Sequence, residues 1–118
     1  MKMNRIKELL HAEVLCGEEM LESEVYSAFC SDMMSDVLAF VNDQGVLLTG
    51  LVNPQVIRTA GMMDMVCVVF VRGKTPGEDI IELAREAGIV VMKTTCRAFE
   101  ASGILYKDGL SPYTGVAV

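Results

Sequence analysis

Residues 46–109 read VLLTGLVNPQVIRTAGMMDMVCVVFVRGKTPGEDIIELAREAGIVVMKTTCRAFEASGILYKDG, and this stretch decides the fold. Three short runs within it are almost continuously apolar: 46–50, 66–71 and 89–92. Strands buried on both faces have this composition, and they belong to mostly parallel sheets covered by helices. The segments between the runs carry apolar residues at helical spacing. We therefore predict an α/β fold built from right-handed βαβ units.

Start and stop signals frame the two helices that join these strands. Asn53 and Pro54 place an N-cap residue before a proline at the first helical position. Thr75 and Glu78 have the spacing of a capping box, in which a hydroxyl and a carboxylate satisfy backbone donors at the start of the second helix. Gly88 is a residue type that ends helices.

A last helix is predicted from about Thr95 to Lys107. It carries Phe99, Gly103 and Tyr106 at helical spacing, and Gly109 is its predicted stop. Before residue 46, the pattern predicts a short helix at 4–10, strands at 12–16 and 24–30, and a helix that begins after Ser31 and Asp32. The whole gives a mostly parallel central sheet of about four to five strands flanked by helices.

A chain of 118 residues has the length of one domain, and we expect a single domain over 1–118. Its parts are an N-terminal helix and strand portion over 1–45, a βαβαβα core over 46–110, and a tail or edge strand over 111–118. No run approaches the roughly 18 apolar residues of a membrane span, and the N-terminus lacks the apolar segment of a secretion signal. A cytoplasmic protein without a membrane partner is expected.

Charge and cysteine usage narrow the function classes further. The net charge is −6 and the ten Lys and Arg residues are dispersed, which argues against nucleic acid as a partner. Four cysteines include no CxxC pair, and the single histidine is His11, so no metal site is predicted. We interpret the cysteines as reduced thiols and predict no cofactor.

Gly73-Lys74-Thr75 resembles the end of a phosphate-binding loop, because it follows a buried strand and precedes a helix. That loop needs another glycine five residues before Gly73, and this position holds Val68, inside the strand. A capped helix is the better interpretation. With no paired nucleophile and base either, no catalytic residue is predicted and an enzyme is not expected.

Several segments together resemble the DRTGG domain, in the form of its small stand-alone members. The resemblance is carried by Leu48-Thr49-Gly50, Asn53-Pro54-Gln55-Val56, VFVRGKTP at 69–76 and ELAREAGI at 82–89, with Ser31 to Val37 upstream and Phe99 to Gly103 downstream. DRTGG domains are similar to the N-terminal domain of the HPr kinase/phosphorylase. They also occur in larger proteins, including some phosphate acetyltransferases, where they regulate or assemble.

The chain departs from the family at its namesake residues. Asn53-Pro54 stands where Asp-Arg is expected, and only Gly73 remains of the final Thr-Gly-Gly. The resemblance implies no kinase activity, because the kinase's phosphate-binding loop lies in a second domain. It implies a non-catalytic regulatory or protein-interaction module, a subunit that associates with itself or with a metabolic or signalling enzyme.

The alternative is a sensor of a nucleotide or phosphorylated metabolite. A more distant resemblance, through Ser31-Asp32, is to the N-terminal domains of cell-wall precursor ligases, which hold a uridine diphosphate group. Open α/β sheets bind ligands at the carboxyl ends of their strands. The candidate ligand-binding residues, for a small anionic ligand, are Ser31, Asp32, Thr49, Asn53, Arg72 and Gly73. The competing interpretation is that Ser31, Asp32 and Asn53 only cap helices.

Nine methionines are many for this length, and they gather at Met33-Met34 and at Met62, Met63 and Met65. Methionine fills irregular cores, and it also forms adaptable partner surfaces. Both interpretations stay open. The second one favours a homo-oligomer, most simply a dimer, or docking onto a partner enzyme.

Overall fold

The chain is described by a computed structural model over residues 1–40 and 45–112. Helices and strands alternate through these residues. The helices are α1 (Met3–Leu10), α2 (Met34–Phe40), α3 (Pro54–Met62), α4 (Glu78–Ala87), α5 (Ala98–Lys107) and a short 3-10 helix, η1 (Glu18–Met20). The strands are β1 (Glu13–Cys16), β2 (Ser27–Cys30), β3 (Gly45–Thr49), β4 (Cys67–Phe70) and β5 (Val90–Lys93).

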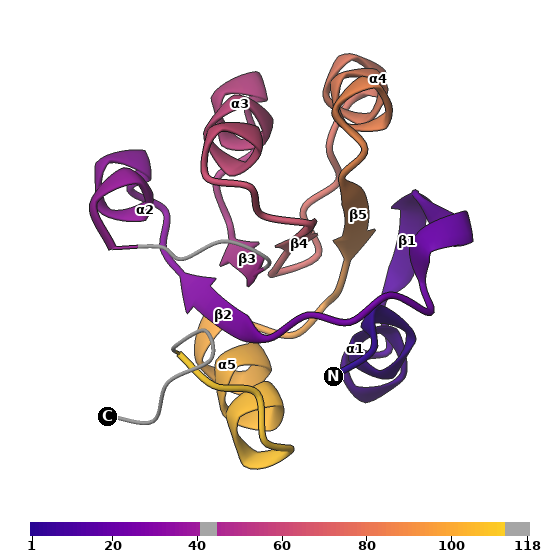
Figure 1. The fold of residues 1–118 in the computed structure, drawn as a ribbon, viewed down its shortest axis with the longest axis vertical. Coiled ribbons are helices and arrows are strands. Elements are labelled where there is room, and N and C mark those ends of the chain that lie inside the picture. Colours follow the sequence, from indigo (N-terminus) through magenta and orange to yellow (C-terminus); the bar gives the residue numbers. More distant parts are fainter. Residues whose placement is uncertain (41–44, 113–118) are drawn as a thin grey trace.

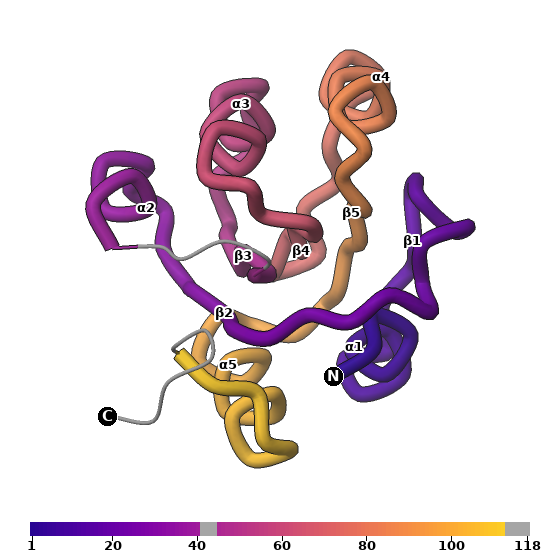
Figure 2. Tube along the Cα trace, in the orientation of Figure 1, coloured from indigo at the N-terminus to yellow at the C-terminus, as the bar shows by residue number. Residues whose placement is uncertain are grey.

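The strands form one sheet in the order β1-β5-β4-β3-β2. Strands β2 to β5 run parallel, and β1 is antiparallel to β5 at the edge. In Figure 1, α2, α3 and α4 cover one face of the sheet, and α1 and α5 cover the other. The tube in Figure 2 passes through three successive βαβ crossovers before the chain changes face to form α5. The predicted, mostly parallel α/β sheet with flanking helices is confirmed.

The two middle strands explain the continuous apolar runs. Every residue of β3 and β4 is buried. Successive side chains of a strand point to opposite faces, so neighbouring residues enter different cores. Leu47 and Val68, which are register partners, pack under α2, α3 and α4, whereas Leu48 and Val69 pack against α1 and α5. Because helices cover both faces of the sheet, neither face meets solvent, and the strand sequences do not alternate between apolar and polar residues.

The helix signals are confirmed at three positions. Asn53 caps α3, because its Oδ1 accepts a hydrogen bond from the Gln55 backbone N–H at 2.9 Å, and Pro54 is the first helical residue. Gly88 ends α4 with a φ of +71°. Gly109 follows the end of α5, also with positive φ.

The predicted capping box at Thr75 is wrong. Helix α4 begins at Glu78, and its N-cap is Gly77, which has no side chain to accept a hydrogen bond. The Thr75 hydroxyl instead accepts a hydrogen bond from Lys93 Nζ at 3.2 Å. The helix start is stabilised by Glu78 and Asp79, whose carboxylates lie at the positive end of the helix dipole.

The last helix begins later than predicted. Residues 95–97 form a loop, and α5 begins at Ala98, where the Glu100 carboxylate accepts from the Arg97 backbone N–H at 3.4 Å. Ala101 and Leu105 are the buried residues of α5. The aromatic residues at helical spacing lie outside: Phe99 is 91% and Tyr106 is 70% exposed.

After α5 the chain returns to the free edge of the sheet. The Ser111 carbonyl accepts from the Ala28 N–H at 2.9 Å, and Ser111 forms a parallel bridge with Ser27 of β2. The pairing at Ser111 is a single bridge, and whether 111–118 form a tail or an edge strand stays a prediction. Residues 113–118 of the predicted tail lie outside the described part of the chain.

A bidentate ion pair joins α1 to the end of α5 and makes stability depend on pH. Arg5 donates to Asp108 from Nε and Nη2, at 3.1 and 2.9 Å. The hydrogen bond from Arg5 lowers the pKa of the Asp108 carboxyl below its ordinary value. Because the folded-state pKa is the lower one, the pair stabilises the fold above the ordinary carboxyl pKa. This contribution is lost as the pH falls through the lowered value.

We expect Arg5→Met to lower the melting temperature at neutral pH, and to lower it less at acidic pH, because protonation of the Asp108 carboxyl removes the charge that Arg5 pairs with. Thermal denaturation, monitored by circular dichroism, measures the melting temperature at each pH. Arg58→Met, which removes another exposed arginine, is the matched control. An equal loss at the two pH values would show that Arg5 stabilises through packing instead of charge.

Candidate functional site

The carboxyl ends of β2, β3 and β4 bring three of the predicted site residues together. Asp32 Oδ1 accepts hydrogen bonds from Thr49 Oγ1 at 3.0 Å and from the Gly50 backbone N–H at 2.7 Å. Arg72 Nη2 lies 3.8 Å from Asp32 Oδ2 and 3.4 Å from the Gly50 carbonyl oxygen. Asp32, Thr49, Gly50 and Arg72 form what we call the carboxyl-edge cluster.

Arg72 is held in an unusual backbone conformation, with φ at +64°. Its N–H donates to the Cys96 carbonyl and the Gly73 N–H donates to the Thr94 carbonyl, both at 2.8 Å. These bonds join the loop after β4 to the loop after β5 and support the left-handed conformation. The guanidinium lies over Gly50, where a β-carbon would come within 2.8 Å of Arg72 Cζ. Gly50 therefore provides the space that the arginine occupies.

Two predicted site residues act as local caps. Asn53 caps α3 as described above. Ser31 Oγ accepts from the Met33 N–H at 2.9 Å, just before α2. Each side chain is thus already used in its own turn. Whether either also touches a ligand stays a prediction.

Gly73 faces a different part of the same edge. With His11, Glu13, Lys93, Thr94 and Thr95 it lines a cavity of about 170 Å³ between the end of β5 and the start of β1. Lys93 Nζ lies 3.2 Å from Thr75 Oγ1 and 3.9 Å from Glu13 Oε1. Lys93 and Thr94 were not among the predicted residues, although their position directly after the third apolar run was a signal for them.

The methionine segments divide between core and surface. Met65 is buried, and Met34 and Met63 pack partly against the core under α2, α3 and α4. Met33 and Met62 are exposed. Core filling therefore holds for Met34, Met63 and Met65, and a partner surface at Met33 and Met62 stays a prediction.

A second candidate site lies on α5, on the other face of the sheet. Four residues at helical spacing point outward, and we call them the α5 surface: Phe99, Ser102, Gly103 and Tyr106. Together with Lys107 they line a shallow hollow of about 340 Å³ that is almost wholly apolar. The aromatic spacing in the sequence was the signal for this surface, but it did not show that the surface is exposed.

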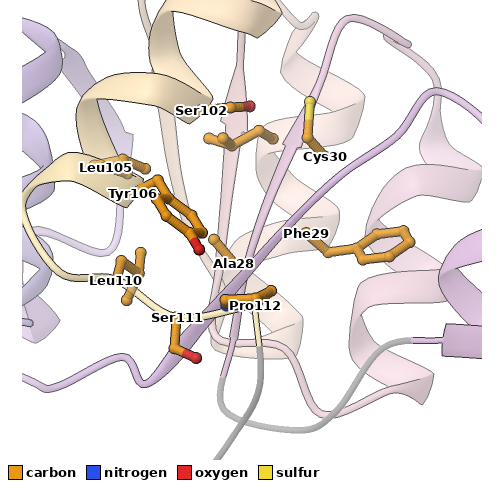
Figure 3. Close-up of a pocket in the computed structure, with 10 residues that line it drawn as sticks. Ala28, Phe29, Cys30, Ser102, Leu105, Tyr106, Leu110, Ser111 and Pro112 are labelled. Carbon is orange, nitrogen blue, oxygen red and sulfur yellow. The ribbon is translucent and has the colours of Figure 1, made fainter. Parts of the chain in front are cut away.

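An apolar cavity of about 120 Å³ adjoins the α5 surface between α5 and β2. Ala28, Leu105, Tyr106, Leu110 and Pro112 are among its lining residues. Figure 3 shows the Tyr106 ring beside Ala28, whereas the Phe29 ring points away to the other side of β2. The turn that returns the chain from α5 to the sheet edge lines its lower side in this view.

Burial makes two of the thiols poor nucleophiles. Desolvation raises the pKa of Cys67, which is fully buried in β4, and also that of Cys16. A thiol with a raised pKa stays protonated at neutral pH, and the thiolate is the reactive form. These two cysteines contribute to packing. In the described ranges, no helix is both long and apolar enough to cross a membrane.

Comparison with known proteins identifies the class. The sheet, its order and the carboxyl-edge cluster define an α/β domain whose polar groups gather at the strand ends and in the loops that follow them. The chain belongs to the DRTGG domain family, which matches residues 5–107. A search of curated proteins finds no match.

A solved structure shares the fold. It is that of the CBS and DRTGG domains of the regulatory region of Clostridium perfringens pyrophosphatase, in complex with the activator diadenosine tetraphosphate. The TM-score is 0.72 at 20% identity, over 96% of this chain and 49% of the other. This chain therefore spans about half the length of that regulatory region.

Proposed function

We propose that this protein is a non-catalytic regulatory module that acts by binding another protein chain through the α5 surface. The observation that carries the proposal is the exposure of two large aromatic side chains, Phe99 and Tyr106, on one face of α5. Fully burying one such ring contributes about 1.5–3 kcal/mol. A folded chain that leaves both in water gives up this stabilisation unless a partner covers them.

The surroundings of the two rings support docking. Ser102 and Gly103 lie between them and present little side chain, so a partner's backbone can approach closely. Beside Tyr106 is the apolar cavity, which is suited to one inserted side chain. Aromatic anchors next to a small pocket are the usual centre of an interface. Membership of the DRTGG family and the similar fold within a regulatory region of another protein support a regulatory role.

The test is whether the immobilised full chain captures a binding protein, compared for wild type, a control variant and a double variant of the α5 surface. We expect wild type and Phe40→Ser to retain the same partner, because Phe40 is exposed on α2, across the sheet from α5. The double variant Phe99→Ser with Tyr106→Ser should lose it. The partner is then purified and its Kd measured, with an expected loss of at least about tenfold. If no association, with itself or with another protein, depends on α5, the proposal is wrong.

A second candidate function is sensing of a phosphorylated small molecule at the carboxyl-edge cluster. Arg72 favours it, because its guanidinium is half-exposed and its contacts with Asp32 and Gly50 are long. Such a group can turn toward a phosphate and bind it bidentately. The related pyrophosphatase region was solved with a nucleotide activator, which suggests nucleotides for the first trials.

For this second function we expect a specific ligand at a hundredfold excess over its Kd to stabilise the fold by about 2.7 kcal/mol, a shift of several degrees. A thermal-shift panel should contain diadenosine tetraphosphate, nucleotides, uridine diphosphate sugars, acyl phosphates and phosphorylated sugars. Arg72→Met should abolish the shift and Arg58→Met should retain it. A shift that survives in Arg72→Met would place the ligand elsewhere.

A further inference from the structure

The α5 surface is complementary to itself. Its residues follow the order large, small, small, large: Phe99, Ser102, Gly103 and Tyr106. The two rings are seven residues apart, about 10 Å along the helix. If a second α5 lies antiparallel on the first, with a twofold axis between positions 102 and 103, position 99 of each helix faces position 106 of the other. The small residues then meet at the axis, where the helices approach most closely.

The cavity beside Tyr106 provides a place for the opposing ring. An apolar cavity of about 150 Å³ in a protein can hold a benzene molecule. The cavity here measures about 120 Å³ and lies at the surface, next to the hollow that the α5 surface lines. Because this volume is smaller than that of the benzene-binding cavity, only the inner part of a phenyl ring from the partner helix enters beside Tyr106 and Leu110, and its outer edge lies against the hollow.

We propose that the α5 surface binds a second copy of this chain, with Phe99 of each copy inserted beside Tyr106 of the other. The inference rests on the proposed function, since it names the partner of that surface. The interface is isologous, so each favourable contact occurs twice. Nothing but this chain's own residues is required to complete it.

Charge at the helix ends agrees with the antiparallel arrangement. Arg97 is exposed directly before α5, and Asp108 directly follows it. In the dimer, Arg97 of one copy lies at the negative end of the helix dipole of the other α5, near an Asp108 carboxylate that Arg5 of its own copy already pairs with. A parallel arrangement would bring like charges together. The charges therefore favour one direction of the partner helix.

The area predicts a weak dimer. Four aromatic rings from two copies supply about 600 Å² at the lower end of what such rings bury. A small specific interface buries about 1,200 Å² in total. The rest must come from the rim around α5 and β2. We expect a Kd of the order of 10 µM, which concentration-dependent measurements can resolve.

The experiment is sedimentation equilibrium of the full chain between about 1 µM and 1 mM. Wild type and Phe40→Ser should show the same monomer–dimer equilibrium. Phe99→Ser should weaken it by at least tenfold. Gly103→Leu should weaken it similarly, because the larger side chain keeps the two helices apart at the twofold axis. A β-carbon at Gly103 meets no atom within 4 Å in the monomer, so we expect the variant to fold. Arg97→Asp should weaken dimerisation in a salt-dependent manner. Unchanged circular dichroism verifies folding.

Two outcomes overturn the inference. One is a wild type that stays monomeric over the whole range. The other is a dimer that Phe99→Ser and Gly103→Leu leave unchanged, which would place the interface elsewhere. A monomer whose capture of a different protein still depends on Phe99 would overturn only the self-association and leave the proposed function standing.

Discussion

Replacing Phe70 by alanine should lower the free energy of unfolding by about 3–5 kcal/mol. Phe70 lies in β4, the middle strand of the sheet, and its side chain is fully buried in the core under α2, α3 and α4. The substitution loses the transfer free energy of the ring and leaves a cavity. Helices cover both faces of the sheet, so the surrounding residues cannot move in to fill it. Urea unfolding measures the effect as a lower midpoint at an unchanged slope.

Phe99→Ala is the matched control, because it removes the same ring from a position that is 91% exposed. We expect a change within about 0.5 kcal/mol in the monomer. Below the concentration at which the chain associates, equal losses for the two variants would contradict the assignment of Phe70 to the core and Phe99 to the surface.

Replacing Gly17 by alanine should cost about 2–5 kcal/mol, through two effects at one residue. Gly17 has a φ of +86°, in the left-handed region that a β-carbon disfavours. That β-carbon would also lie 2.8 Å from Val90 Cγ2 and 2.9 Å from Val90 Cα. Val90 cannot move aside, because β5 is paired on both edges, with β1 and with β4.

Gly88→Ala separates the two effects. Gly88 also has a positive φ, +71°, but a β-carbon there meets no atom within 4 Å. It should cost only the conformational part, about 1–2 kcal/mol. Chemical denaturation of both variants against wild type gives the difference. If Gly17→Ala were no worse than Gly88→Ala, the close approach to Val90 would not be a constraint in solution.

The candidate site was only partly predictable from the sequence. Thr49 ends β3, and Asp32 and Arg72 follow β2 and β4; parallel strands bring these carboxyl ends to one edge. Their proximity could therefore be expected. Lys93 follows the third run in the same way. Its contact with Thr75 depends on how two loops fold over each other, and no local pattern encodes this contact.

The wrong capping box at Thr75 has a physical cause in the tertiary structure. Thr75 and Glu78 have capping-box spacing, but the loop after β4 is bonded to the loop after β5 through Arg72 and Gly73. This arrangement delays the helix until Glu78 and leaves the Thr75 hydroxyl to Lys93. Tertiary hydrogen bonds outweighed a cap, which contributes only about 1 kcal/mol.

The sequence by itself determined the strands, the order of strands and helices along the chain, and the family. Burial on both faces of a sheet requires continuous apolar runs, and helices require apolar residues at helical spacing, so both are visible in the residue types. Tertiary structure alone decided which side of α5 is buried. Ala101 and Leu105 face the sheet, and Phe99 and Tyr106 face water. Both pairs have helical spacing and both are apolar, so periodicity cannot rank them. The small and medium side chains of α5 are the buried ones, and the two large rings are left in water.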